Sequence, residues 1–178
     1  MITKDERGLT LVELIIVVAL IGILSTMLIM GSGYIQNSSA RTLANSIKTA
    51  VGETRIKTMG KQETAVYFYK DASDGKYYKK YVYKVNGSYV TEPGELIGKH
   101  YPTVKYHEDG AASYTEVIPG SGFLICFDRK NGKEALPMSM EVDSVSMNSV
   151  RCDDIEITGG GSVYKVKIEP ATGKVTME

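Results

Sequence analysis

An apolar run of 22 residues, from Leu9 to Met30, follows a polar leader of eight residues and contains one ionisable side chain, Glu13. A helix rises about 1.5 Å per residue, so a helix of this length would span the roughly 30 Å hydrocarbon layer of a bilayer. A helix that is apolar on every side needs a membrane or a large core, and 178 residues provide one domain of moderate size. The run therefore favours a membrane helix over a core helix.

A cleaved secretory signal is another interpretation of this run. Such a signal has a shorter apolar core and a small-residue cleavage site behind it, whereas Gly31-Ser32-Gly33-Tyr34 follows here and no A-x-A-like site is present. Lys4 and Arg7 precede the run and favour a cytoplasmic leader by the positive-inside rule. We expect residues 9–30 to form a single-pass anchor in the cell membrane, with the N-terminus in the cytoplasm and the remaining chain outside.

Glu13 is the exception within the run. A charge in hydrocarbon costs about 2.5–3.5 kcal/mol on insertion scales and usually marks function. The residues alone leave two interpretations open: the side chain extends to the lipid headgroups, because Glu13 lies near one end of the run, or it pairs with a cation of a neighbouring molecule. An ion pair is stronger in a low dielectric than in water, so pairing would favour side-by-side packing of helices.

The residues from Tyr34 to Met59 are predicted to continue as a helix. Apolar side chains recur there at three-, four- or eight-residue steps and so lie on one side. Gly60 is the predicted helix stop, and Gly31-Ser32-Gly33 is a candidate flexible point before the stretch. The apolar stripe indicates ordinary packing against a sheet, and it consists of Ile35, Leu43, Ile47, Ala50 and Val51.

After Gly60 the sequence changes to short alternating runs separated by Asp-Gly and Asn-Gly pairs, which are strong hairpin signals. Thr172-Gly173 marks a last hairpin. We therefore predict an α+β fold in which the second half of one long N-terminal helix packs on antiparallel β-sheet. The predicted strands are Thr64–Lys70, Tyr77–Val85, Ser88–Thr91, Val104–His107, Tyr114–Ile118, Gly122–Phe127, Val150–Ile157, Ser162–Ile168 and Lys174–Met177.

The composition argues against several function classes. Basic and acidic residues both number 21, so the formal net charge is zero and provides no general attraction to nucleic acid. His100 and His107 lack a second pair of metal ligands, and Gly159-Gly160-Gly161 lacks the Lys and Ser of a phosphate loop, so we interpret it as a mobile turn. With no nucleophile elbow and no paired catalytic carboxylates, we expect no enzyme, no cofactor and no metal.

The segment from Tyr77 to Lys84 interleaves aromatic and basic residues. That pattern could stack bases and contact phosphates, with Lys79, Lys80 and Lys84 as the DNA contacts. A strand with wet Tyr and Lys side chains on an exposed face explains the same pattern, and we prefer it because the net charge is zero.

Two acidic turns invite a calcium interpretation. Neither has the ligand spacing of a known calcium loop, and ordinary turn chemistry explains both. The first of these acidic turns contains Asp71, Asp74 and Gly75, and the second contains Asp128, Asn131, Gly132 and Glu134.

Cys126 and Cys152 lie in two predicted strands. An oxidising space outside the cell would permit a disulfide between them, worth about 3.5 kcal/mol in the chain-entropy model. Two separate buried thiols are the alternative, and the residues do not choose between them.

The segment RGLTLVELIIVVALIGIL, from Arg7 to Leu24, resembles the N-terminal signature of the type IV pilin and pseudopilin superfamily. The resemblance implies that prepilin peptidase cuts between Gly8 and Leu9 and that the new N-terminus at Leu9 is methylated. It also implies that Glu13 meets the N-terminal amine of a neighbouring subunit during assembly.

The segments GSGFLICFDRKNGKEA (Gly120–Ala135) and IEITGGGSVYKVKIEPATGKVTM (Ile155–Met177) resemble the minor pseudopilins of the GspH/FimT group. Together the resemblances imply a leader at 1–8, a transmembrane and filament-core helix at 9–30, its amphipathic continuation at 31–60 and a pilin-like β-rich domain at 61–178. The implied partners are prepilin peptidase, other pilin or pseudopilin subunits, the inner-membrane assembly platform and the lipid bilayer.

The expected function is a structural subunit of a type IV pilus, a type II secretion pseudopilus or a competence filament. Two alternatives stay open: a DNA-binding receptor at a filament tip, and a membrane-anchored surface protein that does not polymerise.

Overall fold

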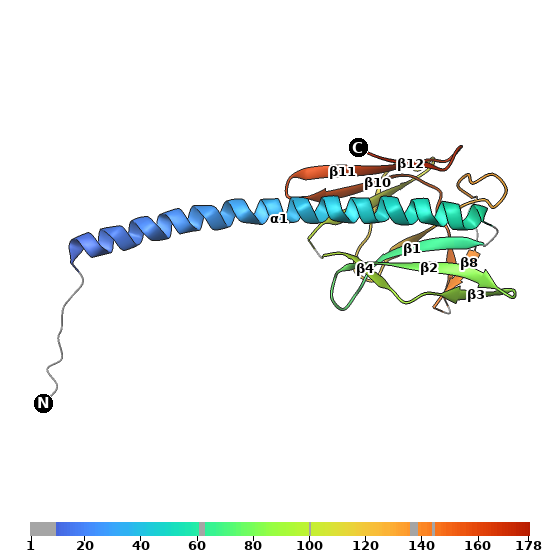
Figure 1. Ribbon diagram of the computed structural model, residues 1–178, viewed down its shortest axis with the longest axis horizontal. Helices are drawn as coiled ribbons and strands as arrows, with labels where there is room; N and C mark the ends of the chain where they lie inside the picture. Colours follow the sequence, from blue (N-terminus) through green and yellow to red (C-terminus); the bar gives the residue numbers. More distant parts are fainter. Residues whose placement is uncertain (1–9, 61–62, 100, 136–138, 144) are drawn as a thin grey trace, which may run out of the picture.

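The computed structural model describes residues 10–60, 63–99, 101–135, 139–143 and 145–178, without the side chains of residues 27–32. Within these ranges the chain forms one long helix, α1 (Leu11–Met59), followed by twelve strands in three antiparallel sheets. The second half of α1 lies against the β-rich body, and its first half extends away from it (Figure 1). The α+β architecture with a long N-terminal helix is therefore confirmed.

The helix runs unbroken for 49 residues, including the predicted flexible point around Gly31 and Gly33. Its second half buries a one-sided stripe, in which Leu43 and Ile47 are enclosed. The hydroxyl of Thr54 donates to the Ala50 carbonyl oxygen at 2.8 Å, so this buried polar group is satisfied within the helix. The helix ends before Gly60 as predicted, although Gly60 has φ −73° and not the left-handed conformation of many glycine caps.

The first sheet has the order β3-β2-β1-β7, and β4 also pairs with β2. The β2–β3 turn shows why the Asn-Gly signal works, since Asn86 and Gly87 both have positive φ, 50° and 90°. The strands are β1 (Thr64–Lys70), β2 (Tyr77–Val85), β3 (Ser88–Thr91), β4 (Glu95–Gly98) and β7 (Gly122–Cys126).

The second sheet has the order β12-β11-β10-β5-β6. Its β10–β5 pairing shifts register between Cys152 and Asp154, so Asp153 lies at an irregularity of the kind called a β-bulge. The strands are β5 (Thr103–Glu108), β6 (Thr115–Glu116), β10 (Cys152–Gly159), β11 (Ser162–Glu169) and β12 (Lys174–Met177). A separate hairpin consists of β8 (Ser139–Val142) and β9 (Val145–Asn148).

Two apolar clusters hold these layers together. The larger one joins the stripe of α1 to the inner faces of both sheets, with Val66 from β1 and Ile155 from β10 among its members. The smaller one lies on the other side of β1, where Ala65 and Leu124 join Met140 of the β8–β9 hairpin. Successive residues of β1 point to opposite faces, so this strand is buried on both sides.

Candidate functional site

The first half of α1 carries the surface that the body does not use. We call Leu11–Leu24 the apolar segment. Its large apolar side chains are 47–74% exposed, and five consecutive ones, Leu14 to Val18, are all exposed. Consecutive helical residues point in directions about 100° apart, so the segment is apolar and uncovered on every side. Its exposed members are Leu11, Val12, Leu14, Ile15, Ile16, Val17, Val18, Leu20, Ile21, Ile23 and Leu24.

An exposed apolar surface of this extent marks a site of interaction with another molecule or with lipid. The predicted membrane-spanning segment, 9–30, extends at both ends beyond the residues whose side chains are described. Within the described part of the chain, no helix is long and apolar enough to cross a membrane. The membrane topology therefore stays a prediction.

Thr10 and Glu13 build the start of α1. Thr10 is the N-cap, and its hydroxyl oxygen accepts a hydrogen bond from the backbone N–H of Glu13 at 3.3 Å. In return, Oε2 of Glu13 accepts from the Thr10 backbone N–H and from the Thr10 hydroxyl, both at 2.8 Å. This is a capping box, which satisfies N–H groups that the first helical turn leaves unpaired.

Both bonds from Thr10 end on the same carboxylate oxygen of Glu13. Oε1 has no hydrogen-bond partner among the residues that the structure describes. The capping box therefore holds the Glu13 side chain at the start of the helix through one of its two carboxylate oxygens. Gly8 and Leu9, the predicted cleavage and methylation residues, lie outside the described residues, so their roles stay predictions.

The three lysines predicted as DNA contacts are all engaged in ion pairs. Lys79 lies 3.2 Å from a carboxylate oxygen of Glu95 and Lys84 lies 3.7 Å from one of Glu63. Lys80 pairs with Asp143 at the β8–β9 turn. Because Lys79 and Lys80 are neighbours on β2, they also point to opposite faces of the sheet. The structure therefore does not gather the three cations on one surface.

Cys126 and Cys152 are free, buried thiols in the structure. Cys126 belongs to the smaller apolar cluster and Cys152 to the larger one. A disulfide between them stays a prediction.

The two acidic turns serve as turn caps. Oδ1 of Asp71 accepts from the Ser73 backbone N–H at 2.7 Å, and Oδ1 of Asp128 accepts from the Lys130 backbone N–H at 2.6 Å. No group of three or more His, Cys, Asp or Glu side chains is placed to hold a metal ion within the described ranges.

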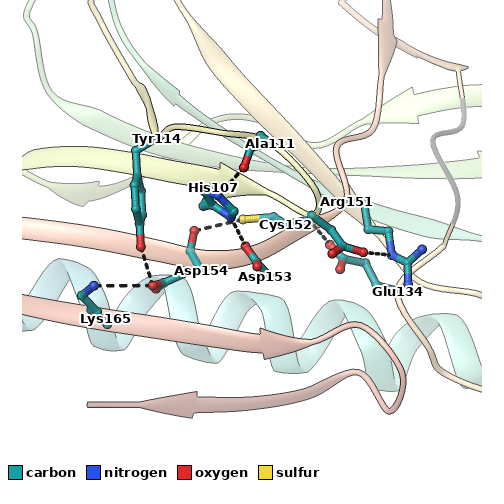
Figure 2. Close-up of polar contacts among 10 residues, drawn as sticks. His107, Ala111, Tyr114, Glu134, Arg151, Cys152, Asp153, Asp154 and Lys165 are labelled. Atoms are coloured by element: carbon teal, nitrogen blue, oxygen red, sulfur yellow. Dashed lines mark hydrogen bonds and ion pairs between the residues drawn. The ribbon is translucent and has the colours of Figure 1, made fainter.

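The structure shows a polar cluster around the start of β10 that the sequence did not predict (Figure 2). His107 Nδ1 lies 2.6 Å from Oδ1 of Asp153, and this hydrogen bond raises the pKa of His107 above its ordinary value. The Tyr114 hydroxyl donates to Asp154 at 2.7 Å. These pairs join residues 40 or more positions apart, so no local sequence signal could have revealed them.

Glu134 is the buried member of this cluster. Its side chain follows the Asn131-Gly132 turn, and the residue is only 6% exposed. Oε1 accepts from the Cys152 backbone N–H at 2.6 Å, while Oε2 is buried without a hydrogen-bond partner among the described residues. Burial raises the pKa of Glu134 to about 8. The sequence pattern had indicated Glu134 only as a possible calcium ligand, and not as a buried carboxyl group.

Comparison with protein families supports the N-terminal assignment. Residues 3–29 match the model of the prokaryotic N-terminal methylation motif, which is the motif of type IV pilin-like proteins. Searches of curated proteins and of solved structures gave no match to the chain. The matched residues include the first part of α1, where the exposed apolar segment and the Thr10–Glu13 capping box lie.

Proposed function

We propose that the protein is a structural subunit, a minor pilin or pseudopilin, of a type IV pilus, a type II secretion pseudopilus or a competence filament. The observation that carries the proposal is the conjunction of the methylation motif at residues 3–29 with an apolar segment exposed on every side. A filament in which each subunit contributes such a segment would cover it with the segments of its neighbours. The role is structural, not catalytic.

Processing would begin with prepilin peptidase, which cuts between Gly8 and Leu9 and gives Leu9 a free amine that is then methylated. The capping box would hold Glu13 in place, with Oε1 free to accept from the Leu9 amine of an adjacent subunit. A charge pair in a dry environment is strong, and a lone buried carboxylate is costly. The pairing would therefore favour staggered packing of subunits on the inner-membrane assembly platform.

The body resembles the GspH/FimT group in sequence at Gly120–Ala135 and Ile155–Met177. These segments contain β7 and the β10-β11-β12 meander, which pack against the second half of α1. We assign the protein to this minor-subunit group as part of the proposal, with residues 9–30 in the membrane before assembly and the body on the outer side.

Mass spectrometry of the mature N-terminus tests the proposal. A methylated Leu9 is expected, and Gly8→Ala should leave an uncut precursor that enters no filament. A native Met1 or a chain that has lost the apolar segment would contradict the proposal. Normal processing without recovery in sheared filaments would instead support an anchored protein that does not polymerise.

Glu13→Ala separates the role of the motif in processing from its role in assembly. This variant should be cut and methylated normally but enter filaments poorly, because the carboxylate that accepts the neighbouring amine is missing. Lys48→Ala, which removes an exposed charge on the body half of α1, is the control. Normal incorporation of Glu13→Ala would remove the pairing from the mechanism and leave the processing intact.

A further inference from the structure

The chain just before β10 of the second sheet bonds to β7 of the first sheet. The Val150 backbone N–H donates to the Leu124 carbonyl oxygen at 2.8 Å, and two residues further on the Cys152 N–H donates to the Glu134 carboxylate at 2.6 Å. Glu134 itself belongs to the segment 127–135, which turns back on β7 through a bond from the Ala135 N–H to the Cys126 carbonyl oxygen at 3.0 Å. We call the Glu134–Cys152 contact and the segment 127–135 the junction.

No cation contacts Glu134 among the described residues. Arg151 is the nearest positive charge that acts on it, but the Arg151 guanidinium pairs with Asp109 at 3.2 Å. Asp109 and Asp153 oppose the charge of an ionised Glu134, and His107 is occupied by Asp153. The segment 127–135 also carries Asp128, Arg129, Lys130 and Lys133, and Arg55 of α1 bonds to its Gly132. The buried thiols of Cys126 and Cys152 lie beside the junction.

This environment disfavours an ionised Glu134 more than a protonated one, whose O–H at Oε2 would be buried without an acceptor among the described residues. The neutral carboxyl accepts from the Cys152 N–H and carries no charge, whereas an ionised carboxyl places an unpaired charge in a site that is 6% exposed. The protonation state of Glu134 therefore sets how stable the Glu134–Cys152 contact is.

We propose that Glu134 is a proton-operated latch: the protonated carboxyl holds the segment 127–135 against β10, and loss of the proton releases that segment and uncovers the thiols of Cys126 and Cys152. The released segment would also loosen the end of α1, because Arg55 Nε donates to the Gly132 carbonyl oxygen at 3.0 Å. The latch is a property of the body and does not depend on the proposed filament function.

The sign of the pH effect follows from the raised pKa. The closed junction keeps its proton up to about pH 8, whereas a hydrated glutamate loses it near pH 4.5. Between these values the open state binds fewer protons than the closed state, so the opening equilibrium rises with pH by up to about tenfold per unit. Above the upper value both states are ionised, and the rise stops.

Hydrogen exchange of the Cys152 amide in the full-length protein in detergent measures this equilibrium directly. After correction for the intrinsic exchange rate, opening in the wild type should increase by up to about 100-fold from about pH 5.5 to about pH 7.5. Glu134→Gln should abolish the increase, because a neutral amide keeps the acceptor and cannot ionise. Glu141→Gln removes an exposed carboxylate on β8 and serves as the control. Equal increases in the wild type and Glu134→Gln would overturn the proposal.

Asp109→Asn provides a second variant if Glu134→Gln does not fold. It frees Arg151 from its ion pair and removes an anion that opposes ionisation of Glu134. Both effects lower the pKa of Glu134 in the closed state. The increase in opening with pH then ends at a lower pH, so the total increase should be smaller. An unchanged increase in this variant would also overturn the proposal.

Thiol alkylation supplies an independent readout at a fixed pH near 7.5. Cys126 and Cys152 in the wild type should react at least about tenfold faster than in Glu134→Gln, since the latch is open more often. The charge of Glu134 raises the pKa of both thiols, so electrostatics alone would make the Gln variant react faster. Faster labelling of Glu134→Gln would therefore contradict the latch.

Discussion

The two halves of α1 share one helical geometry and have opposite surroundings. In the body half, Leu43 is fully buried between the helix and the sheets, while in the apolar segment Leu20 is 54% exposed. The body half is stabilised by its own chain through a one-sided stripe, as in other amphipathic helices. The apolar segment has no equivalent cover within the described residues.

The comparison predicts a large difference between matched truncations in the two halves. Leu43→Ala should lower the free energy of unfolding of the body by about 2–5 kcal/mol, because it leaves a cavity in a closed core. Leu20→Ala should change it by less than about 0.5 kcal/mol but should reduce recovery in filaments. Thermal or urea unfolding of the full chain measures both, and a similar loss in the two variants would mean that the apolar segment packs on the body.

A second prediction concerns the boundary between the halves, where the β10–β11 turn contacts the helix. Gly160 has φ +60°, and a Cβ atom there would lie 2.2 Å from the Gly33 carbonyl oxygen. Gly160→Ala should therefore cost about 1–3 kcal/mol through strain and through displacement of the turn from α1. Gly161, with φ +81°, faces open space, and Gly161→Asn is the control because Asn tolerates this conformation. Equal unfolding midpoints for the two variants would show that the close approach is unimportant.

This turn also has a feature that the sequence interpretation did not include. The Gly159-Gly160-Gly161 run was expected to be a mobile turn, but its backbone contacts α1 more than 120 residues away in the sequence. The interpretation treated glycine as flexibility, whereas two of these glycines permit a close approach. A close approach depends on the partner segment, which local sequence does not reveal.

Local signals predicted most of the framework. The bounds of β1, β2, β3 and β12 agree with the predictions, because alternation and Asn-Gly or Asp-Gly turns are encoded within a few residues. β4 was missed because its four residues include the exposed Leu96 and a terminal glycine. The β8–β9 hairpin was missed because Ser, Met and acidic residues weaken its strand pattern.

The candidate site also has one part that the local sequence predicts and another part that depends on distant segments. The motif around Glu13 could be recognised because it is contiguous in the sequence. The structure adds that Thr10 is the N-cap of the helix there. The partners of Lys79 and Lys80 could not be predicted, since neither the pairing of β4 with β2 nor the separate β8–β9 hairpin had been recognised.

A third prediction tests whether the capping box prepares the apolar segment for assembly. Thr10→Val keeps the shape of the side chain but removes the hydroxyl that bonds to Glu13, and it should weaken the helix start by about 1 kcal/mol. We expect normal cleavage, lower recovery in filaments and an unchanged unfolding midpoint of the body. Thr10→Ser restores the hydroxyl and should restore recovery. Reduced recovery in both variants would assign the effect to side-chain shape and not to the capping box.

The smallest effect is expected within the body, at the His107–Asp153 pair. The pKa of His107 is raised by its bond to Asp153, so the pair stabilises the fold fully below the ordinary histidine value, about 6.5. This stabilisation is lost as pH rises through the higher folded value, where the imidazole loses its charge. Nuclear magnetic resonance titration should give a His107 pKa above the ordinary value and a lower one in Asp153→Asn. Since the apolar segment contains no histidine, a change of pH in this range should leave filament assembly unaffected. A loss of filaments in Asp153→Asn would show instead that the β-rich body takes part in assembly.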